Sequence, residues 1–238
     1  MKIIFIRHGE PDYSVDNLTE KGKRETALLT NRLLKLPAVT DVYCSPLGRA
    51  IATAKPYLQA TGRTAFVKRW MQEFNAKVFD KEKNDYKIPW DFYPADWTKD
   101  KKVFDKDDWV NSDLLNETVA PAYKDVCTGI DALLKEYGYT RSGNMYLSDE
   151  KDKDVTILIF CHLGAQFAML SHLLGISAFM LWHCFYVAPT SVTTLVSEER
   201  KPGQAFFRVT GLGDTSHLYQ AGEPISHSGL FDTPHTEL

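Results

Sequence analysis

The chain has 238 residues, of which 44% are hydrophobic and 25% charged, a balance typical of a globular protein that buries a core. The formal net charge is −3 and the lysines and arginines are scattered, which argues against nucleic acid as a partner and against a polybasic patch for a membrane surface. A small anionic substrate remains compatible, because it needs positive charge only locally.

The N-terminal segment predicts a strand followed by a helix. Residues 2–6 are rich in β-branched and aromatic side chains, which predicts a buried strand that ends at Arg7 and His8. Residues 20–36 predict a helix, with Thr19 as its N-cap and Pro37 as its stop. The apolar positions of this helix lie at helical spacing and are expected to face inward: Ala27, Leu28, Leu33 and Leu34.

Two further strands flank a second helix. Residues 39–44 and 65–68 read as strands. Between them, Ser45 and Pro46 predict a helix start, with serine as N-cap and proline at the first helical position. Gly62 fits the C-terminal end of this helix.

Residues 74–116 show no clear periodicity. A long irregular segment is uncommon in a compact domain and is usually functional. Its aromatic residues stand among many lysines and aspartates: Tyr86, Trp90, Phe92, Tyr93, Trp97 and Trp109. They indicate either a cap over a pocket or a surface loop whose aromatic side chains anchor it to the domain. Exposed aromatics there could equally serve a homodimer contact.

The C-terminal half begins with an amphipathic helix. Apolar residues spaced by four and three predict it over residues 116–137, with Pro121 near its first turn. Residues 155–160 predict a fourth strand, which leads to His162 and a helix from Leu163.

The remaining part predicts two strands and a tail. Residues 191–197 and 205–210 read as strands joined by a polar turn at 201–203, and the tail after Gly211 is expected to be loosely held. Residues 155–197 contain no Asp, Glu, Lys or Arg, which raises the question of a membrane span. The stretch is interrupted by polar and turn-forming residues: His162, Gly164, Gln166, His172, Gly175, His183 and Pro189. A strand, a helix and a strand of a buried core, with no membrane contact, is the better interpretation.

Strands that alternate with helices predict an α/β fold, a three-layer sandwich with a mostly parallel sheet flanked by helices. We expect a single domain over residues 1–238, with residues 74–116 as a cap-like insertion. In such sheets ligands bind beyond the carboxyl ends of the strands. The side chains at or just after such ends are Arg7, His8, Ser45, Arg49, Glu73 and His162.

These residue types suit phosphoryl transfer, which needs a nucleophile, cations for the phosphoryl oxygens and an acid for the leaving oxygen. A neutral imidazole can attack phosphorus when a hydrogen bond to its other nitrogen fixes the tautomer. Arginine matches phosphate oxygens bidentately. His8, Arg7, Arg49, His162 and Glu73 supply these parts. Leu163 and Gly164 open a helix whose free amides could add anion stabilisation.

Four motifs occur in order along the chain: FIRHGE at residues 5–10, LTEKG at 18–22, YCSPLGRA at 43–50 with Thr53, and CHLG at 161–164. They resemble the RHG, LTxxG, SxLxRAxxT and HG elements of the histidine phosphatase superfamily, the phosphoglycerate mutase-like enzymes. Residues 189–192 also resemble a polar stretch that precedes a late strand there. A lone RHG is weak, but the ordered set covers most of the chain outside residues 74–116.

The resemblance implies a phosphoglycerate mutase-like fold and a set of roles. His8 would be the phosphorylated nucleophile, and Arg7, Arg49 and His162 would form the phosphate pocket. The family needs no metal, and no cofactor is expected.

The proton donor is matched by position alone. Glu73 stands where the family has its donor, but the usual downstream Gly-rich or Trp-Glu sequence is missing, so Glu10 and Asp12 remain alternatives. The chain also departs from the family in having Leu after His162 and in lacking Trp-Asn after Glu10. These departures bear on substrate contacts and not on phosphohistidine chemistry.

The cysteines show no metal-binding or disulfide spacing: Cys44, Cys127, Cys161 and Cys184. Free thiols indicate a reducing compartment, and the apolar run at the N-terminus is too short for a signal peptide, so a cytoplasmic location is expected.

Two other chemistries are less favoured. The segment from Cys44 to Arg49 superficially resembles the Cys-(X)5-Arg loop of cysteine-dependent phosphatases, but four residues intervene and Pro46 lacks an amide. A zinc site on His162, His172 and His183 lacks any short ligand pair, so the latter two are expected to be core or surface histidines.

The sequence therefore predicts a phosphomonoester hydrolase that acts on a small phosphorylated metabolite. A mutase remains an alternative, and it would need cations for a doubly anionic product. The irregular segment has no arginine but carries lysines at positions 81, 83, 87, 99, 101, 102 and 106. A phosphate-binding regulatory protein without turnover is a third reading.

Overall fold

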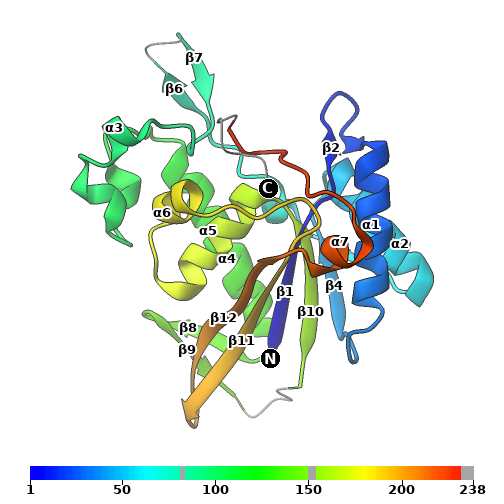
Figure 1. Cartoon of the computed structure of the whole chain (residues 1–238). Helices are drawn as coiled ribbons and strands as arrows, with labels where there is room; N and C mark the ends of the chain where they lie inside the picture. The colour runs from blue at the N-terminus through cyan, green and yellow to red at the C-terminus, as the bar shows by residue number, and fades with distance from the viewer. Residues whose placement is uncertain (81–83, 150–153, 232–238) are drawn as a thin grey trace.

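The computed structural model describes residues 1–80, 84–149 and 154–231. Its centre is a sheet of order β5-β4-β10-β1-β11-β12-β9-β8 (Figure 1). The strands are β1 (Lys2–Arg7), β4 (Asp41–Cys44), β5 (Phe66–Val67), β8 (Tyr139–Ser142), β9 (Met145–Ser148), β10 (Thr156–Cys161), β11 (Val192–Lys201) and β12 (Gln204–Asp214). The half from β5 to β1 is parallel, and the half from β11 to β8 is antiparallel. The small pairs are β2 (Pro11–Asp12) with β3 (Asn17–Leu18), and β6 (Val78–Asp80) with β7 (Asp85–Lys87).

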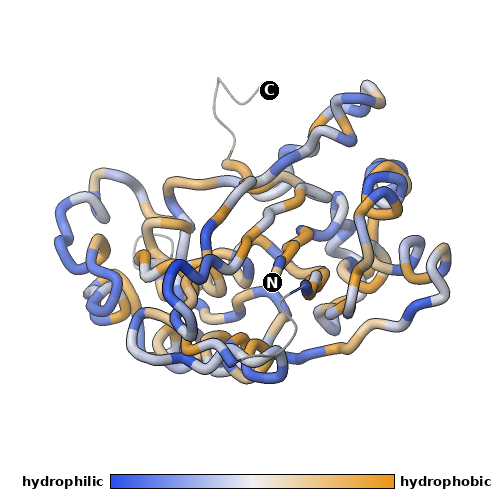
Figure 2. The backbone as a smooth tube through the Cα atoms, turned by 90° about the horizontal axis from the view of Figure 1, so that it is seen from below, coloured by the Kyte–Doolittle hydropathy of each residue, from blue (hydrophilic) through white to orange (hydrophobic). Residues whose placement is uncertain are grey.

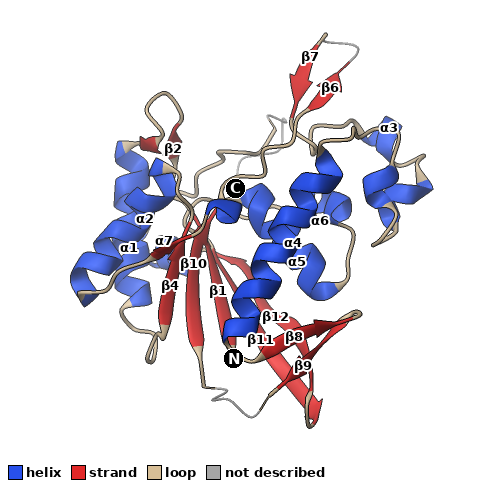
Figure 3. Cartoon of the chain, turned by 180° about the vertical axis from the view of Figure 1, so that it is seen from behind, coloured by secondary structure: helices blue, strands red, loops and turns tan. Residues whose placement is uncertain are grey.

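Helices cover both faces of the sheet. One side carries α1 (Glu20–Leu33), α2 (Gly48–Thr61) and α7 (Ser216–Ala221); the other carries α4 (Val119–Glu136), α5 (Leu163–Leu174) and α6 (Ala178–Cys184) (Figure 3). The short helices α3 (Pro94–Trp97), η1 (Arg69–Met71), η2 (Lys101–Phe104) and η3 (Trp109–Asn111) lie in the connecting segments. The predicted three-layer α/β architecture is confirmed. The sheet is mixed rather than mostly parallel, because β11, β12, β9 and β8 all pair antiparallel.

The alternation of side chains along β1 builds the two cores. Ile3 and Phe5 pack into the larger hydrophobic cluster, with α4, α5 and α6, whereas Ile4 and Ile6 pack into the smaller one, with α1 and α2. Successive strand residues point to opposite faces, so a run that is apolar throughout must be covered on both. Figure 2 shows the hydrophobic segments gathered inside the more hydrophilic outer turns.

The stretch without charged residues is confirmed as a folded core segment. It forms β10, α5, α6 and the start of β11. Helix α5 is buried nearly all round because the sheet and two helices enclose it, which explains its lack of a polar face. In the described part of the chain, no helix is long and apolar enough to cross a membrane.

Some local predictions were wrong. Helix α1 buries Leu29 and Leu33 as well as Glu25 and Thr26, while Ala27 and Leu34 face solvent. Glu25 occupies the buried face because its carboxylate accepts the Glu10 amide of the loop after β1, and the Thr26 hydroxyl donates to the Gly22 carbonyl within the helix. The β8–β9 hairpin and α6 were not foreseen. The described part of the tail, residues 212–231, continues β12, forms α7 and is then held by hydrogen bonds from Arg7 and Tyr186, rather than hanging free. Residues 232–238 lie outside the described residues.

The described parts of residues 74–116, which we call the cap, contain β6, β7, α3, η2 and η3. Trp109 is fully buried, edge-on to Trp182 at 5.3 Å and to Tyr123 at 4.9 Å. Part of the aromatic set therefore anchors the cap to α4 and α6. Lys81 and Lys83 lie outside the described residues.

Glu25 gives the fold a pH dependence. Its side chain is fully buried, and Oε2 accepts the Glu10 amide at 2.8 Å. Burial, aided by the Glu10 carboxylate, raises the pKa of Glu25 to about 7 from an ordinary 4.5. Because the folded-state pKa is the higher one, the stabilisation is complete below pH 4.5 and is lost as pH rises through 7.

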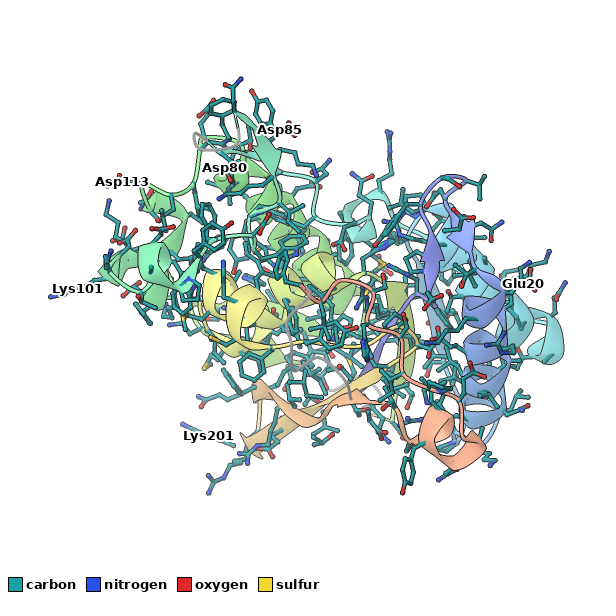
Figure 4. All side chains as sticks on the ribbon, turned by 45° about the horizontal axis from the view of Figure 1, so that its top comes forward. Glu20, Asp80, Asp85, Lys101, Asp113 and Lys201 are labelled. Carbon is teal, nitrogen blue, oxygen red and sulfur yellow. The ribbon has the colours of Figure 1, made fainter. Side chains whose placement is uncertain are left out.

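We expect Glu25→Gln to remove this loss, since glutamine keeps an acceptor for the Glu10 amide. Between pH 4.5 and pH 8 the unchanged protein should lose up to about 3 kcal/mol of its free energy of unfolding through this group. The variant should not show this loss. Urea unfolding at the two pH values measures this. Glu20→Gln, at an exposed position of the same helix (Figure 4), is the matched control. Parallel pH dependence in the protein and both variants would contradict the assignment.

Candidate active site

His8 lies immediately after β1, buried at the carboxyl end of the parallel strands. Its Nδ1 is 2.8 Å from the Gly9 carbonyl oxygen. Burial, followed by the charge of Arg7, lowers the pKa of His8 well below its ordinary 6.5, so the ring is neutral and carries one proton. A carbonyl can only accept, which places that proton on Nδ1 and leaves a lone pair on Nε2. The arrangement is that of a nucleophilic imidazole.

The backbone around His8 is held from three sides. The His8 amide donates to the Cys161 carbonyl at 3.0 Å, and the Gly9 amide donates to Thr53 Oγ1 at 2.9 Å. The Thr190 amide donates to the His8 carbonyl at 3.2 Å. Thr190 has φ of 58°, a strained conformation for a β-branched residue, of the kind that clusters at functional sites.

The glycines of two motifs permit a close approach of chain segments. A Cβ on Gly9 would lie 2.9 Å from the Gly22 carbonyl oxygen, and one on Gly22 would lie 2.3 Å from that of Glu10. The loop after β1 and the first turn of α1 are therefore in backbone contact. This explains why the RHG and LTxxG elements occur together.

Arg7 and Arg49 bring two buried guanidinium groups to the site. Arg7 donates from Nη1 to the Val187 carbonyl at 2.7 Å and from Nη2 to the Ser228 carbonyl at 2.8 Å. Arg49 pairs with Asp16 through Nη1 at 2.5 Å. These contacts fix both groups before any ligand arrives.

His162 follows β10 and caps α5, with its ring centroid 5.0 Å from that of His8. Burial and the neighbouring His8 and arginines lower the pKa of His162 well below 6.5. Its Nε2 lies 2.7 Å from Ser45 Oγ, which also accepts the Leu47 amide at 3.3 Å. A serine hydroxyl that accepts one bond can donate its own proton to Nε2, which leaves the imidazole proton on Nδ1. Ser45, predicted as a helix cap, instead positions His162, and α2 begins later, at Gly48.

Three buried nitrogens at the site have no hydrogen-bond partner among the described residues: Arg7 Nε, Arg49 Nε and His162 Nδ1. Buried donors are almost always satisfied, and each one left unpaired costs about 1–3 kcal/mol. Two guanidinium donors and an imidazole donor in one place are complementary to an oxyanion with several acceptor oxygens. A phosphoryl group has oxygens of this kind.

Glu73 supplies a carboxyl group to the same pocket. Its Oε1 accepts the Phe74 amide at 2.8 Å and the Ala165 amide at 3.0 Å, while Oε2 has no partner among the described residues. Burial raises the pKa of Glu73 above its ordinary 4.5. The group is thus disposed to hold a proton that it can give away. The sequence analysis expected the first amides of α5 to be free to bind an anion. The Ala165 amide is not free, because it donates to Glu73.

The alternative acids lie elsewhere. Glu10 accepts the Thr19 hydroxyl at 2.9 Å and lies 3.8 Å from Lys21 Nζ, and Asp12 binds Ser14. Neither lines the pocket that holds Arg7, Arg49 and Glu73. The geometry favours Glu73.

The pocket lined by Arg7, Arg49 and Glu73, which we call the phosphate pocket, has a volume of about 340 Å³. His8 and His162 are not among its wall residues. Its walls contain the predicted residues Arg7, Arg49, Glu73 and Leu163, and Trp90 from the aromatic set of the irregular segment. They also contain residues that the sequence did not single out: Tyr13, Lys77, Ile88, Gly229, Leu230 and Phe231. The last three belong to the C-terminal segment, red in Figure 1, which crosses above the carboxyl ends of the parallel strands. Gly229 has φ of 88°, and a Cβ there would lie 2.8 Å from Arg7 Nη2. Glycine is required at that crossing.

The remaining candidates have structural roles. Cys44 is buried, and burial raises the pKa of its thiol to about 12, so it is no thiolate nucleophile. His172 pairs with Asp131 at 2.9 Å, and His183 stacks on Phe179. Among the described residues no group of three or more His, Cys, Asp or Glu is placed to hold a metal ion.

Comparison with known proteins identifies the family. The model of the histidine phosphatase superfamily (branch 1) matches residues 3–209. The chain belongs to this superfamily. No curated protein matches the chain in sequence.

Solved histidine phosphatase structures share the fold. A phosphoserine phosphatase mutant from Entamoeba histolytica, in complex with phosphoserine, is 20% identical, with a TM-score of 0.61 over 91% of this chain and 98% of that one. A mycobacterial glucosyl-3-phosphoglycerate phosphatase is 16% identical, with a TM-score of 0.60 over 89% and 98%. An alpha-ribazole phosphatase from Shigella flexneri is 22% identical, with a TM-score of 0.57 over 90% and 97%. The predicted resemblance and fold are confirmed.

Proposed function

We propose that the protein is a metal-independent phosphomonoester hydrolase that works through a phosphohistidine. The observation that carries this is the neutral His8, whose Nδ1 is held by the Gly9 carbonyl and which lies near the charges of Arg7 and Arg49. Glu73, whose pKa is raised by burial, lines the same pocket as the two arginines. Membership of the superfamily and the phosphoserine complex of a structural relative support a small phosphorylated metabolite as substrate.

The first half of the reaction transfers the phosphoryl group to His8. The Nε2 lone pair attacks phosphorus, while the bond from phosphorus to the leaving oxygen breaks. Glu73 gives its proton to that oxygen, and the alcohol departs. Arg7, Arg49 and His162 Nδ1 hold the phosphoryl oxygens as negative charge builds up.

The second half returns the site to its starting state. The Glu73 carboxylate takes a proton from water, whose oxygen attacks the phosphorus of phospho-His8. The bond to Nε2 breaks, inorganic phosphate leaves, and Glu73 is protonated again. No step requires a further reactant.

The lysines of the cap give the mutase alternative little support. Lys87 pairs with Asp80 at 3.1 Å, and Lys102 and Lys106 bind acidic neighbours. Of the described lysines only Lys77 lines the phosphate pocket. A second anionic group on a retained product would find few cations there.

We also propose a cytoplasmic location, supported by the cysteines of the chain, which are all free, with three of the four buried. Exposed aromatics of the cap, such as Phe79 and Tyr86, support a homodimer contact as a further proposal.

The hydrolase predicts steady release of inorganic phosphate from p-nitrophenyl phosphate in the presence of EDTA. Interconversion of phosphoglycerates without net phosphate release would instead indicate a mutase. Vanadate binding without turnover of any ester would indicate a regulatory phosphate-binding protein. Activity that EDTA abolishes would contradict the metal-independent mechanism.

A further inference from the structure

A second cavity, of about 800 Å³, adjoins the phosphate pocket. The two share five wall residues: Trp90, Leu163, Gly229, Leu230 and Phe231. The larger one is lined mainly by aromatic side chains, and we call it the aromatic chamber: Trp90, Phe92, Trp97, Trp182, Tyr186 and Phe231. Its volume is that of a site for a drug-sized molecule, far beyond the few atoms of a serine side chain.

The chamber begins where the leaving group departs. A Cβ on Gly164 would lie 2.7 Å from Glu73 Oε1 and 2.4 Å from the Trp90 ring, so carboxyl and indole rest against the same glycine. An alcohol whose oxygen takes a proton from Glu73 has its carbon skeleton beside Trp90. Beyond Trp90 the open space is the aromatic chamber.

The floor of the chamber is rigid. Trp182 donates from Nε1 to the Gly164 carbonyl at 3.0 Å, and its ring lies 5.5 Å from Trp90 and 4.8 Å from Phe74. Both tryptophans are buried, whereas Tyr93 (55% exposed) and Phe231 (53% exposed) form the rim. Fixed aromatic faces favour a flat ring that can stack or meet them edge-on.

The chamber offers no cation to a carboxylate. Of its described wall residues, none is lysine or arginine, and Asp91 is the charged one. His183 is neutral, because burial lowers its pKa to about 4. Lys87 lies over Phe92 but pairs with Asp80 and is not part of the wall. Charged residues of the cap such as Asp85, Lys101 and Asp113 lie on its outer edge (Figure 4).

We propose that the aromatic chamber is the leaving-group subsite of the hydrolase inferred above, and that the substrate is the phosphomonoester of an alcohol carrying a planar aromatic ring system. This deepens the proposed function and rests on it. Small carboxylate-bearing phosphates such as phosphoserine leave the chamber unfilled and meet no lysine or arginine among its described wall residues.

Three primary alkyl esters test the assignment, because their leaving oxygens are chemically alike. We expect kcat/KM for naphthylethyl phosphate to exceed that for ethyl phosphate and phosphoserine by about 100-fold. The double variant Tyr93→Ala/Phe231→Ala should reduce this preference about 10-fold. Phe79→Ala, an exposed aromatic of the cap outside the chamber wall, is the matched control and should preserve it.

The outcomes distinguish failure of the chamber proposal from failure of the proposed hydrolase function. Equal kcat/KM for naphthylethyl and ethyl phosphate, or a preference for phosphoserine, overturns the chamber and leaves the hydrolase intact. If no ester is hydrolysed, the hydrolase fails, and calorimetric binding decides the chamber. Tight binding of naphthylethyl phosphate that weakens in the double variant, and not in Phe79→Ala, supports it; binding no tighter than that of ethyl phosphate overturns it.

Discussion

Replacement of His8 by alanine should lower kcat for every phosphomonoester by a factor on the order of 10⁴ or more. The side chain supplies the attacking Nε2, and the Gly9 carbonyl fixes the tautomer in which Nε2 has a free lone pair. Alanine removes that nitrogen. His162, with its ring 5.0 Å away, does not substitute, because Ser45 holds its Nε2 and its Nδ1 carries the proton. The loss should appear in kcat, since the groups that hold the phosphoryl oxygens remain.

Two measurements accompany the rate. Acid-labile, base-stable phosphate should be trapped on the unchanged protein after rapid quenching with a labelled ester, and none on His8→Ala. The variant should still bind vanadate, because Arg7 and Arg49 are held by contacts that do not involve His8. His172→Gln, at the opposite end of α5 from His162 and paired with Asp131 outside the pocket wall, serves as control and should keep its activity. Turnover that survives in His8→Ala would exclude the phosphohistidine route.

The positions of the arginines and histidines of the site could be predicted because they depend on topology alone. The apolar run of β1 and that of β10 each predict a buried strand, and parallel strands carry the next residue to the same edge of the sheet. Arg7, His8 and His162 therefore converge whatever the loops do. Arg49 follows the same rule one strand further, after β4.

The roles of polar residues near the site were harder to predict because local propensity and tertiary contact compete. Ser45 before Pro46 is a good helix cap by local rules, but its hydroxyl binds His162, more than a hundred positions away in sequence. Glu25 and Thr26 stand on the buried face of α1, where the apolar spacing pointed to Ala27 and Leu34. Hydrophobic periodicity carries no signal for a buried carboxyl group that holds a loop amide.

The walls of the pockets could not be predicted from sequence. Trp90 is one of several aromatics in the cap, and only the packing of Trp90 and Trp182 around Gly164 separates it from Trp109, which anchors the cap. The C-terminal residues Gly229 and Leu230 reach the site by crossing the sheet edge. The preceding Ser228 carbonyl accepts hydrogen bonds from Tyr186 and Arg7. The glycine- and serine-rich composition of this tail indicates only a loop.

Glu73→Gln should show a loss that depends on the leaving group. For an alkyl ester in single turnover, the release of alcohol should slow by about 10²–10⁴-fold, because no group then gives a proton to the departing oxygen. For p-nitrophenyl phosphate the first turnover should be nearly unchanged, since nitrophenolate leaves without a proton. Later turnovers should be slow with both esters, because the same carboxylate activates water against phospho-His8. A burst of nitrophenol followed by a slow phase is therefore expected.

The pH dependence separates proton donation from a structural role. Glu73 must be protonated to donate, and burial raises its pKa, so the single-turnover rate for the alkyl ester should be full at acid pH. It should fall as pH rises through that raised pKa, and this alkaline decline should be absent from Glu73→Gln. Acid pH should not inactivate His8 early, because its own pKa is lowered well below 6.5. Glu10→Gln, whose carboxylate binds Thr19 outside the pocket, is the control and should retain both the alkaline decline and the difference between esters. If Glu73→Gln slows both esters equally in the first turnover, the carboxyl acts by holding the Phe74 and Ala165 amides, and the proton must come from another group.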